Sequence, residues 1–94
     1  MNVENVKNDS GRSVENQFIL RGNKGTIFQS YDSLIVLKAE GKIYLNKDYW
    51  DYSKTTGRYR NLFLREDKKE TEKKIKDGQY ILLSDDEIKK ISID

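Results

Sequence analysis

The chain has 94 residues and a formal net charge of +2, and its 36 % charged and 35 % hydrophobic residues are typical of one small globular domain. It contains no cysteine and no histidine. This excludes disulfide scaffolds, zinc fingers, thiol nucleophiles and catalysis or metal binding by histidine. We therefore expect a protein that is not an enzyme and that has no cofactor or metal site.

Residues 1–16 are polar, and beyond Met1 their only aliphatic side chains are Val3, Val6 and Val14. Such a segment buries too little apolar surface to offset its conformational entropy. We expect a flexible N-terminal arm over residues 1–16 and a single domain over residues 17–94. The first ten residues also lack the apolar core of a signal peptide.

Short apolar segments separated by turn residues predict the strands. The segments are 17–21, 26–31, 34–37, 42–46 and 79–83. The third contains the only run of four aliphatic residues, which is typical of a strand buried on both faces. The turns at 22–25 and 39–41 contain glycine and favour antiparallel connections. The sequence predicts a small, mostly antiparallel sheet of three to five strands.

Two or three short helices are expected after residue 53. Residues 53–56 offer several N-caps for a first helix, with Tyr59, Leu62, Phe63 and Glu66 on one side. Lys54, Arg58, Asn61 and Arg65 lie on its other side. Capping boxes at residues 67–70 and 84–87 predict two further helix starts, and Gly78 ends the second helix. The fold class is α+β, with the helices packed on one side of the sheet.

Residues 49–64 contain the only tryptophan, half of the six tyrosines and several basic side chains. Trp, Tyr and Arg most often dominate the energy of protein interfaces. We therefore expect a partner-binding surface formed by Tyr49, Trp50, Tyr52, Lys54, Arg58, Tyr59, Arg60 and Arg65. The alternative is that the aromatic rings pack the end of the sheet and the first helix, while the cations form a solvated helix face.

The carboxylates nearest this stretch are those of Asp32, Asp48 and Asp51. Two or three of them would have to converge to form a hydrolase or a magnesium site. Each lies beside a predicted turn, where aspartate commonly makes local hydrogen bonds. We expect no catalytic role for them.

The segments 28–33, 41–45, 50–53, 59–64 and 78–82, together with Thr55 and Thr56, resemble a family of small proteins of unknown function. The family, of the DUF8033 type, occurs in phages and mobile elements of Gram-positive bacteria. The resemblance covers about residues 17–83, and the Trp-Asp-Tyr-Ser motif at 50–53 is its most specific part. It implies a genomic setting and no activity.

Together these features predict an accessory protein that binds and inhibits a host protein or ribonucleoprotein complex, most simply for counter-defence in the manner of an anti-CRISPR protein. Such a protein would be cytoplasmic in a bacterial host and would have no membrane partner. The alternative is a nucleic-acid-binding accessory protein that uses the Arg and Tyr side chains of the helix at residues 54–65. The sequence leaves the oligomeric state open.

Overall fold

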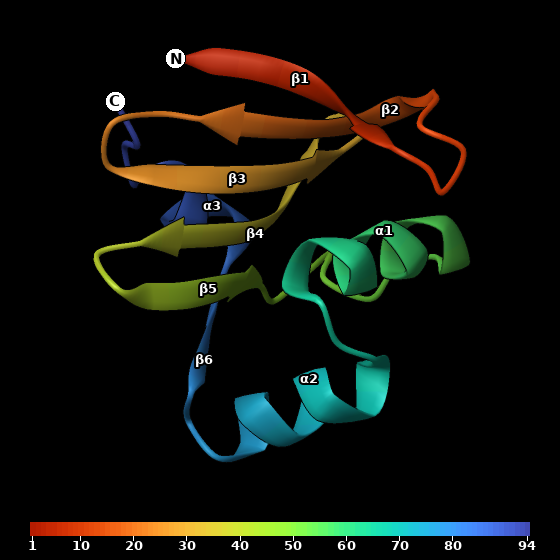
Figure 1. Cartoon of the computed structure of the whole chain (residues 1–94). Helices are drawn as coiled ribbons and strands as arrows, with labels where there is room; N and C mark the ends of the chain where they lie inside the picture. Colours follow the sequence, from red (N-terminus) through yellow and green to blue (C-terminus); the bar gives the residue numbers. More distant parts are fainter.

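The computed structural model describes residues 1–94 as one six-stranded sheet with three short helices (Figure 1). The strands are β1 (Asn2–Lys7), β2 (Ser13–Arg21), β3 (Gly25–Ser30), β4 (Ser33–Ala39), β5 (Lys42–Asn46) and β6 (Tyr80–Leu83). The helices are α1 (Lys54–Leu64), α2 (Lys68–Lys76) and α3 (Asp85–Lys89). None of these helices has the length and apolar character needed to span a lipid bilayer.

The strands lie in the sheet in chain order, from β1 at one edge to β6 at the other. Each pair from β1 to β5 is antiparallel, whereas β6 runs parallel to β5 after the crossover through α1 and α2. The sheet is therefore mixed. The expected count of three to five strands was wrong, because the sheet has six.

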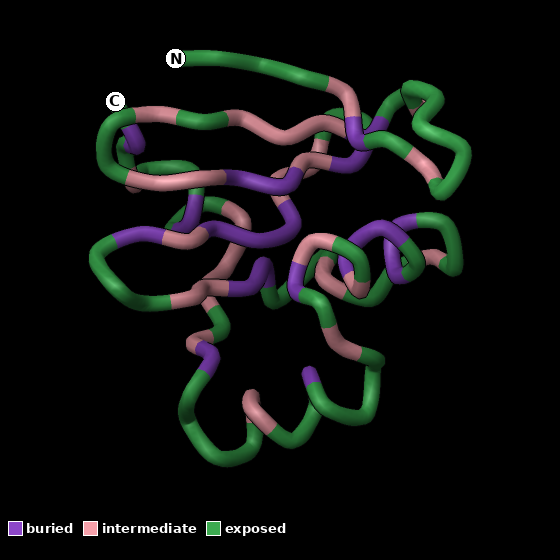
Figure 2. Tube along the Cα trace, in the orientation of Figure 1, coloured by how far each residue is buried: buried purple, intermediate pink, exposed green.

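The additional strand comes from the expected flexible arm. Residues 2–7 pair antiparallel with β2, from Asn2 opposite Arg21 to Lys7 opposite Ser13, with a bulge between Asn5 and Lys7. The outer part of β1 is exposed (Figure 2), and its side chain at Val6 alone enters the core. Backbone pairing, this one valine and polar contacts of Glu4 and Asn5 with β2 thus hold β1, so a count of aliphatic residues did not predict the strand.

Both faces of the central strands are covered, which corrects the expectation that the helices pack on one side. On one face, Phe28 and Val36 pack with Tyr59 and Leu64 of α1. On the other face, Leu37 packs with Ile88 of α3, which lies behind β4 in Figure 1. The run of aliphatic residues in β4 is divided between these faces, with Ile35 and Val36 in the first core and Leu34 and Leu37 in the second, so burying it requires a layer on each side. The predicted burial of this strand on both faces is confirmed.

The C-terminal segment after α3 returns to the turn between β2 and β3. The N–H of Lys24 donates to the carbonyl of Ile93 at 2.7 Å, and the Ile93 side chain is buried in the second core. Gly22 permits this approach, because a Cβ at that position would lie 2.1 Å from the Ile93 carbonyl oxygen. The C-terminal segment thus closes the second core against this turn.

The helix starts expected from capping residues are confirmed. Ser53 caps α1, and complete capping boxes open α2 at Asp67 and α3 at Ser84. Helix α2 buries only Thr71 and half-buries Ile75, and it therefore lies on the surface.

Replacement of Val6 by alanine tests whether residues 2–7 form a strand. Val6 is 6 % exposed and Val3 is 56 % exposed. We expect Val6→Ala to lower the free energy of unfolding by about 1–2 kcal/mol through lost apolar burial. Val3→Ala should change it by less than about 0.5 kcal/mol. Chemical denaturation measures both values, and equal effects would show that residues 1–7 are a flexible arm.

Candidate functional site

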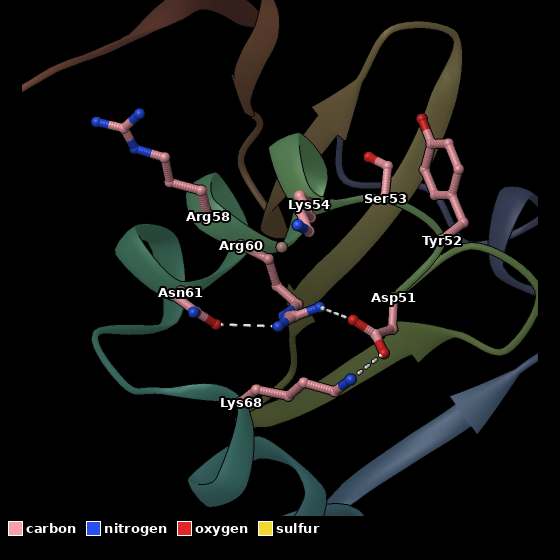
Figure 3. A pocket seen from close by; sticks show the side chains of 9 residues that line it. Asp51, Tyr52, Ser53, Lys54, Arg58, Arg60, Asn61 and Lys68 are labelled. Atoms are coloured by element: carbon pink, nitrogen blue, oxygen red, sulfur yellow. Dashed lines mark hydrogen bonds and ion pairs between the residues drawn. The ribbon is translucent and has the colours of Figure 1, made fainter.

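An open groove lies at the N-terminal end of α1, between the loop that follows β5 and the first residue of α2 (Figure 3). It encloses about 620 Å³, and only one of its nine lining residues is hydrophobic. The lining residues are Asp51, Tyr52, Ser53, Lys54, Gly57, Arg58, Arg60, Asn61 and Lys68. Small-molecule pockets are usually enclosed and apolar, so this groove better suits a polar surface of a larger partner.

Asn46 anchors the loop that forms one wall of the groove. It is fully buried at the end of β5, and its carbonyl accepts the N–H of Trp50 at 2.8 Å and that of Tyr49 at 3.3 Å. Its side-chain oxygen accepts the N–H of Asp48 at 2.9 Å, while its amide nitrogen donates to Asp85 at 2.8 Å. The loop therefore leaves the sheet in one defined direction.

The first turn of α1 is fixed to the sheet by buried hydroxyl groups. The Ser53 hydroxyl accepts the N–H of Thr56 at 3.1 Å and caps the helix. The Thr56 hydroxyl lies 2.8 Å from that of Ser30 in β3, and both side chains are fully buried. Because buried polar groups need partners, this pair sets where α1 lies on the sheet.

Arg60 connects α1 to the loop, and only 1 % of it is exposed. One terminal nitrogen donates to the Trp50 carbonyl at 2.6 Å and to the Asp51 carboxylate at 3.2 Å. The other donates to the Asn61 side chain at 3.0 Å, and the guanidinium lies 5.0 Å from the Trp50 ring centre. Arg60 was expected to contact a partner; its burial and hydrogen bonds place it in the framework that holds the loop and the helix.

Asp51 joins two cations at the rim of the groove. It accepts from Arg60 and forms a 2.7 Å ion pair with Lys68, the first residue of α2 (Figure 3). Burial opposes its ionisation, but the hydrogen bonds from Lys68 and Arg60 outweigh burial and hold the pKa of Asp51 below its ordinary value. The carboxylate is therefore charged at neutral pH and fixes α2 beside α1.

The remaining cations of the groove have no ion-pair partner. Lys54 and Arg58 are exposed and form no salt bridge, and the first turn of α1 contains no acidic residue. The N-terminus of a helix carries partial positive charge from the backbone dipoles. The electrostatic potential at this end of α1 therefore favours an anionic partner group.

The aromatic residues of the loop divide into exposed and packed side chains. Tyr49 and Tyr52 are exposed, and their rings meet edge to face at a centroid distance of 5.6 Å. Trp50 is half-buried against the core and lies beside Arg60. The two tyrosines thus present aromatic surface on a loop that Trp50 helps to hold.

The eight residues expected to bind a partner fall into three groups in the structure. Those gathered at the N-terminal end of α1 and exposed are Tyr49, Tyr52, Lys54 and Arg58. The framework residues are Trp50, Tyr59 and Arg60. Arg65 is exposed at the other end of α1, about 16 Å from Lys54 along the helix axis.

Two lining residues of the groove, Asn61 and Lys68, were not among the expected contacts. Lys68 is the first residue of α2. The N-cap at Asp67 predicts that α2 begins at Lys68, with only three residues between the two helices. This gave weak evidence that Lys68 lies close to α1. The ion pair between Lys68 and Asp51 joins residues seventeen positions apart and depends on the tertiary structure. The sequence pattern of α2 alone could not predict it.

A second polar cluster holds α1, α2 and β6 together around Glu66, whose side chain is 2 % exposed. Its carboxylate accepts from Thr71 at 2.6 Å, Tyr80 at 2.6 Å and Lys74 at 2.7 Å. Burial opposes ionisation of Glu66, but these hydrogen bonds hold its pKa below the ordinary value. Burial and then the hydrogen bond to Glu66 raise the pKa of Tyr80 to about 12. The cluster is structural.

The three carboxylates considered for catalysis do not converge. Asp48 accepts the N–H of Asp85, the first residue of α3, at 3.0 Å, whereas Asp51 pairs with cations at the groove. The structure contains no group of three or more carboxylates placed to hold a metal ion. Asp48 and Asp51 thus serve local structure.

Fold and site define a small α+β protein with a groove that combines the exposed Tyr52 with unpaired cations, while Tyr49 is exposed on the same loop. The chain belongs to DUF8033, a family of unknown function, whose model matches residues 1–79. The match includes β1 and ends directly before β6. No curated protein and no solved structure matches the chain.

Replacement of Arg60 tests its framework role. Arg60→Ala leaves the Trp50 carbonyl and Asp51 without their donors, and we expect it to cost about 2–4 kcal/mol of unfolding free energy. Arg58→Ala removes an exposed arginine of the same helix and should change stability by less than about 0.5 kcal/mol. Chemical denaturation compares the two variants. A small effect of Arg60→Ala would contradict the framework role.

The Glu66 cluster predicts a pH dependence of stability. Because its pKa is lowered in the folded state, Glu66 contributes stability above its ordinary pKa of 4.5, and this contribution is lost as pH falls through the folded value. We expect Glu66→Gln to lower stability at pH 7 and to reduce its loss on acidification. The exposed Glu72→Gln is the control and should keep the wild-type dependence. Urea unfolding between pH 7 and 3 measures both, and parallel curves for wild type and Glu66→Gln would refute the prediction.

Proposed function

We propose that this protein is a non-enzymatic binding protein that inhibits a partner protein through the groove at the N-terminal end of α1. In its most specific form, the proposal is a phage-type accessory protein for counter-defence, of the anti-CRISPR kind, that acts sterically on a host protein or ribonucleoprotein complex. The contact residues are Tyr49, Tyr52, Lys54 and Arg58. The observation that carries the proposal is that these four exposed side chains stand on a framework of buried hydrogen bonds.

A rigid surface of this kind favours binding because little conformational entropy remains to be lost. The loop before α1 is held by Asn46, and the helix is held by Thr56 and Arg60. Tyrosine offers a large contact area with few rotatable bonds, and arginine is enriched among residues that dominate binding energy. Lys54 and Arg58 would select an acidic patch on the partner and steer its approach.

A second candidate function is binding of nucleic acid through the same groove. It is supported by the position of two exposed tyrosine rings beside cations that form no ion pair. Stacking of bases on aromatic rings, combined with phosphate contacts, is the usual mode of binding single strands. Affinity for nucleic acid would fall steeply and log-linearly with salt, whereas an aromatic protein interface would respond less.

The test begins with affinity capture from host lysate, with and without nuclease, and then measures the affinity of the purified partner for variants. We expect a discrete protein complex that persists after nuclease treatment. Tyr52→Ala and Lys54→Glu should each weaken binding by about tenfold or more. Lys42→Glu makes the same charge change in β5, away from the groove, and should leave affinity unchanged.

Two results would overturn the proposed function. Loss of the captured proteins on nuclease treatment, with a steep salt dependence, would favour the nucleic-acid alternative. Unchanged affinity in both groove variants would remove this surface from the interaction, provided that their unfolding curves match the wild type.

A further inference from the structure

A trough runs along the opposite flank of α1, between the helix and strands β1 and β2. Three adjoining depressions form it, and all three include Leu62. The middle depression is apolar, with Val6, Ile19 and Phe63 around Leu62. The trough extends from the hairpin residue Asp9 at one end to Arg65 at the other. None of the proposed function's contact residues except Arg58 borders it.

Leu62 is the most unexpected side chain of this surface. The helical pattern placed it on the inward side of α1 with Tyr59 and Phe63, but it is 47 % exposed. Tyr59 and Phe63 are packed against the core, so the helix turns Leu62 to the rim of the sheet. An exposed leucine alone is ordinary. Here Leu62 belongs to the apolar middle depression, which forms the apolar floor of the trough. This floor makes the surface suitable for an apolar side chain of a partner.

The charges around the trough are strongly unbalanced. Five cations line it, against the single carboxylate of Asp9; they are Lys7, Arg21, Lys38, Arg58 and Arg65. Only Arg21 forms an ion pair, with Glu4 at 3.0 Å. The unpaired cations stand at both ends of the apolar floor, with Arg58 and Arg65 seven residues apart, or about 10 Å along α1.

At the Arg65 end of the trough, nearby carboxylates do not neutralise the positive charge, as the surroundings of Lys38 show. Its ammonium lies 4.4 Å from the centre of the Phe63 ring and donates to the Phe63 carbonyl at 3.3 Å. Burial, followed by the positive charge of Arg65, lowers the pKa of Lys38, while Glu66 opposes this shift only in part. A negative group near Arg65 would therefore be stabilised by two cations at once.

From this combination we propose that the trough binds an acidic peptide segment of a partner protein, with an apolar side chain against Leu62 and carboxylates at the Arg58 and Arg65 ends. Charge complementarity selects the acidic residues, and the aliphatic floor selects the central side chain. The floor argues for a peptide over a nucleic acid. Its aromatic rings are covered, Tyr59 by the core and Phe63 by Lys38, so a base finds no free ring for stacking.

This inference goes beyond the proposed function, because it concerns the other flank of α1 and a different contact set. The two surfaces are tested separately. A segment of about three or four extended residues spans the distance between Arg58 and Arg65, so a peptide of about eight residues is a sufficient probe. The probe is a fluorescein-labelled peptide of glutamates with a central leucine and phenylalanine. In one control peptide lysine replaces glutamate, and in a second serine replaces the two apolar residues.

Fluorescence anisotropy with the full chain measures the affinity of each peptide. We expect the acidic apolar peptide to bind at least about tenfold more tightly than either control. Leu62→Ser should weaken its binding by about tenfold, whereas Leu82→Ser, which changes a 37 % exposed leucine of β6, should not. Arg65→Asn should also weaken binding. Asparagine suits the left-handed backbone at this position, where φ is 58°, so the fold is retained.

The experiments also distinguish the proposed peptide from other ligands of the trough, each of which gives a different result. Equal affinity for the acidic apolar peptide and the serine control, or for wild type and Leu62→Ser, would overturn the proposal in favour of charge alone. Preference for single-stranded oligothymidylate would identify a nucleic-acid surface and also overturn it. A sedimenting dimer that Leu62→Ser converts to monomer would assign the trough to a second copy of the chain. Tyr52→Ala is expected to leave peptide affinity unchanged, so failure of the groove proposal would not affect this test.

Discussion

The buried guanidinium of Arg60 is the constraint on which the arrangement around α1 depends. Its hydrogen bonds to the Trp50 carbonyl, Asp51 and Asn61 join the loop after β5 to the middle of the helix. A buried charge is costly unless it is paired and hydrogen-bonded, so this geometry has few alternatives. Through the second ion pair of Asp51, with Lys68, the same network also sets the start of α2. One side chain thus fixes the relative positions of a loop and two helices.

Because α1 is held in this way, its two flanks present different chemistry. The flank beside the loop is polar and combines exposed tyrosines with Lys54, whereas the flank beside β2 is apolar in its middle and cationic at its ends. Arg58 borders both surfaces. A partner that covered both would contact a single rigid ridge, and its binding would require little rearrangement of this protein.

The sequence predicted the local elements better than their assembly. Capping residues such as Ser53 determine helix starts through neighbours three positions away, so their signal is contained in a short segment. The strand β1 is held by backbone pairing with β2, which leaves little trace in side-chain pattern. The role of Arg60 depends on a loop ten positions earlier, and α3 covers the second face of β4 only through tertiary packing. The sequence indicated where aromatic and basic residues gather in the chain, but helical spacing alone could not predict which of the arginines are exposed.

The return of the C-terminal segment to the turn between β2 and β3 affects how the chain folds during its synthesis. The first core is contributed by residues up to Tyr80, but the second core closes only when Ile88 and Ile93 cover Leu37. A nascent chain emerging at about 5–20 residues per second therefore carries an uncovered apolar face until α3 and Ile93 have left the ribosome. The pairing of β6 with β5 adds a non-local contact that also forms late. This face of the sheet is thus covered only when Ile93 docks beside Gly22.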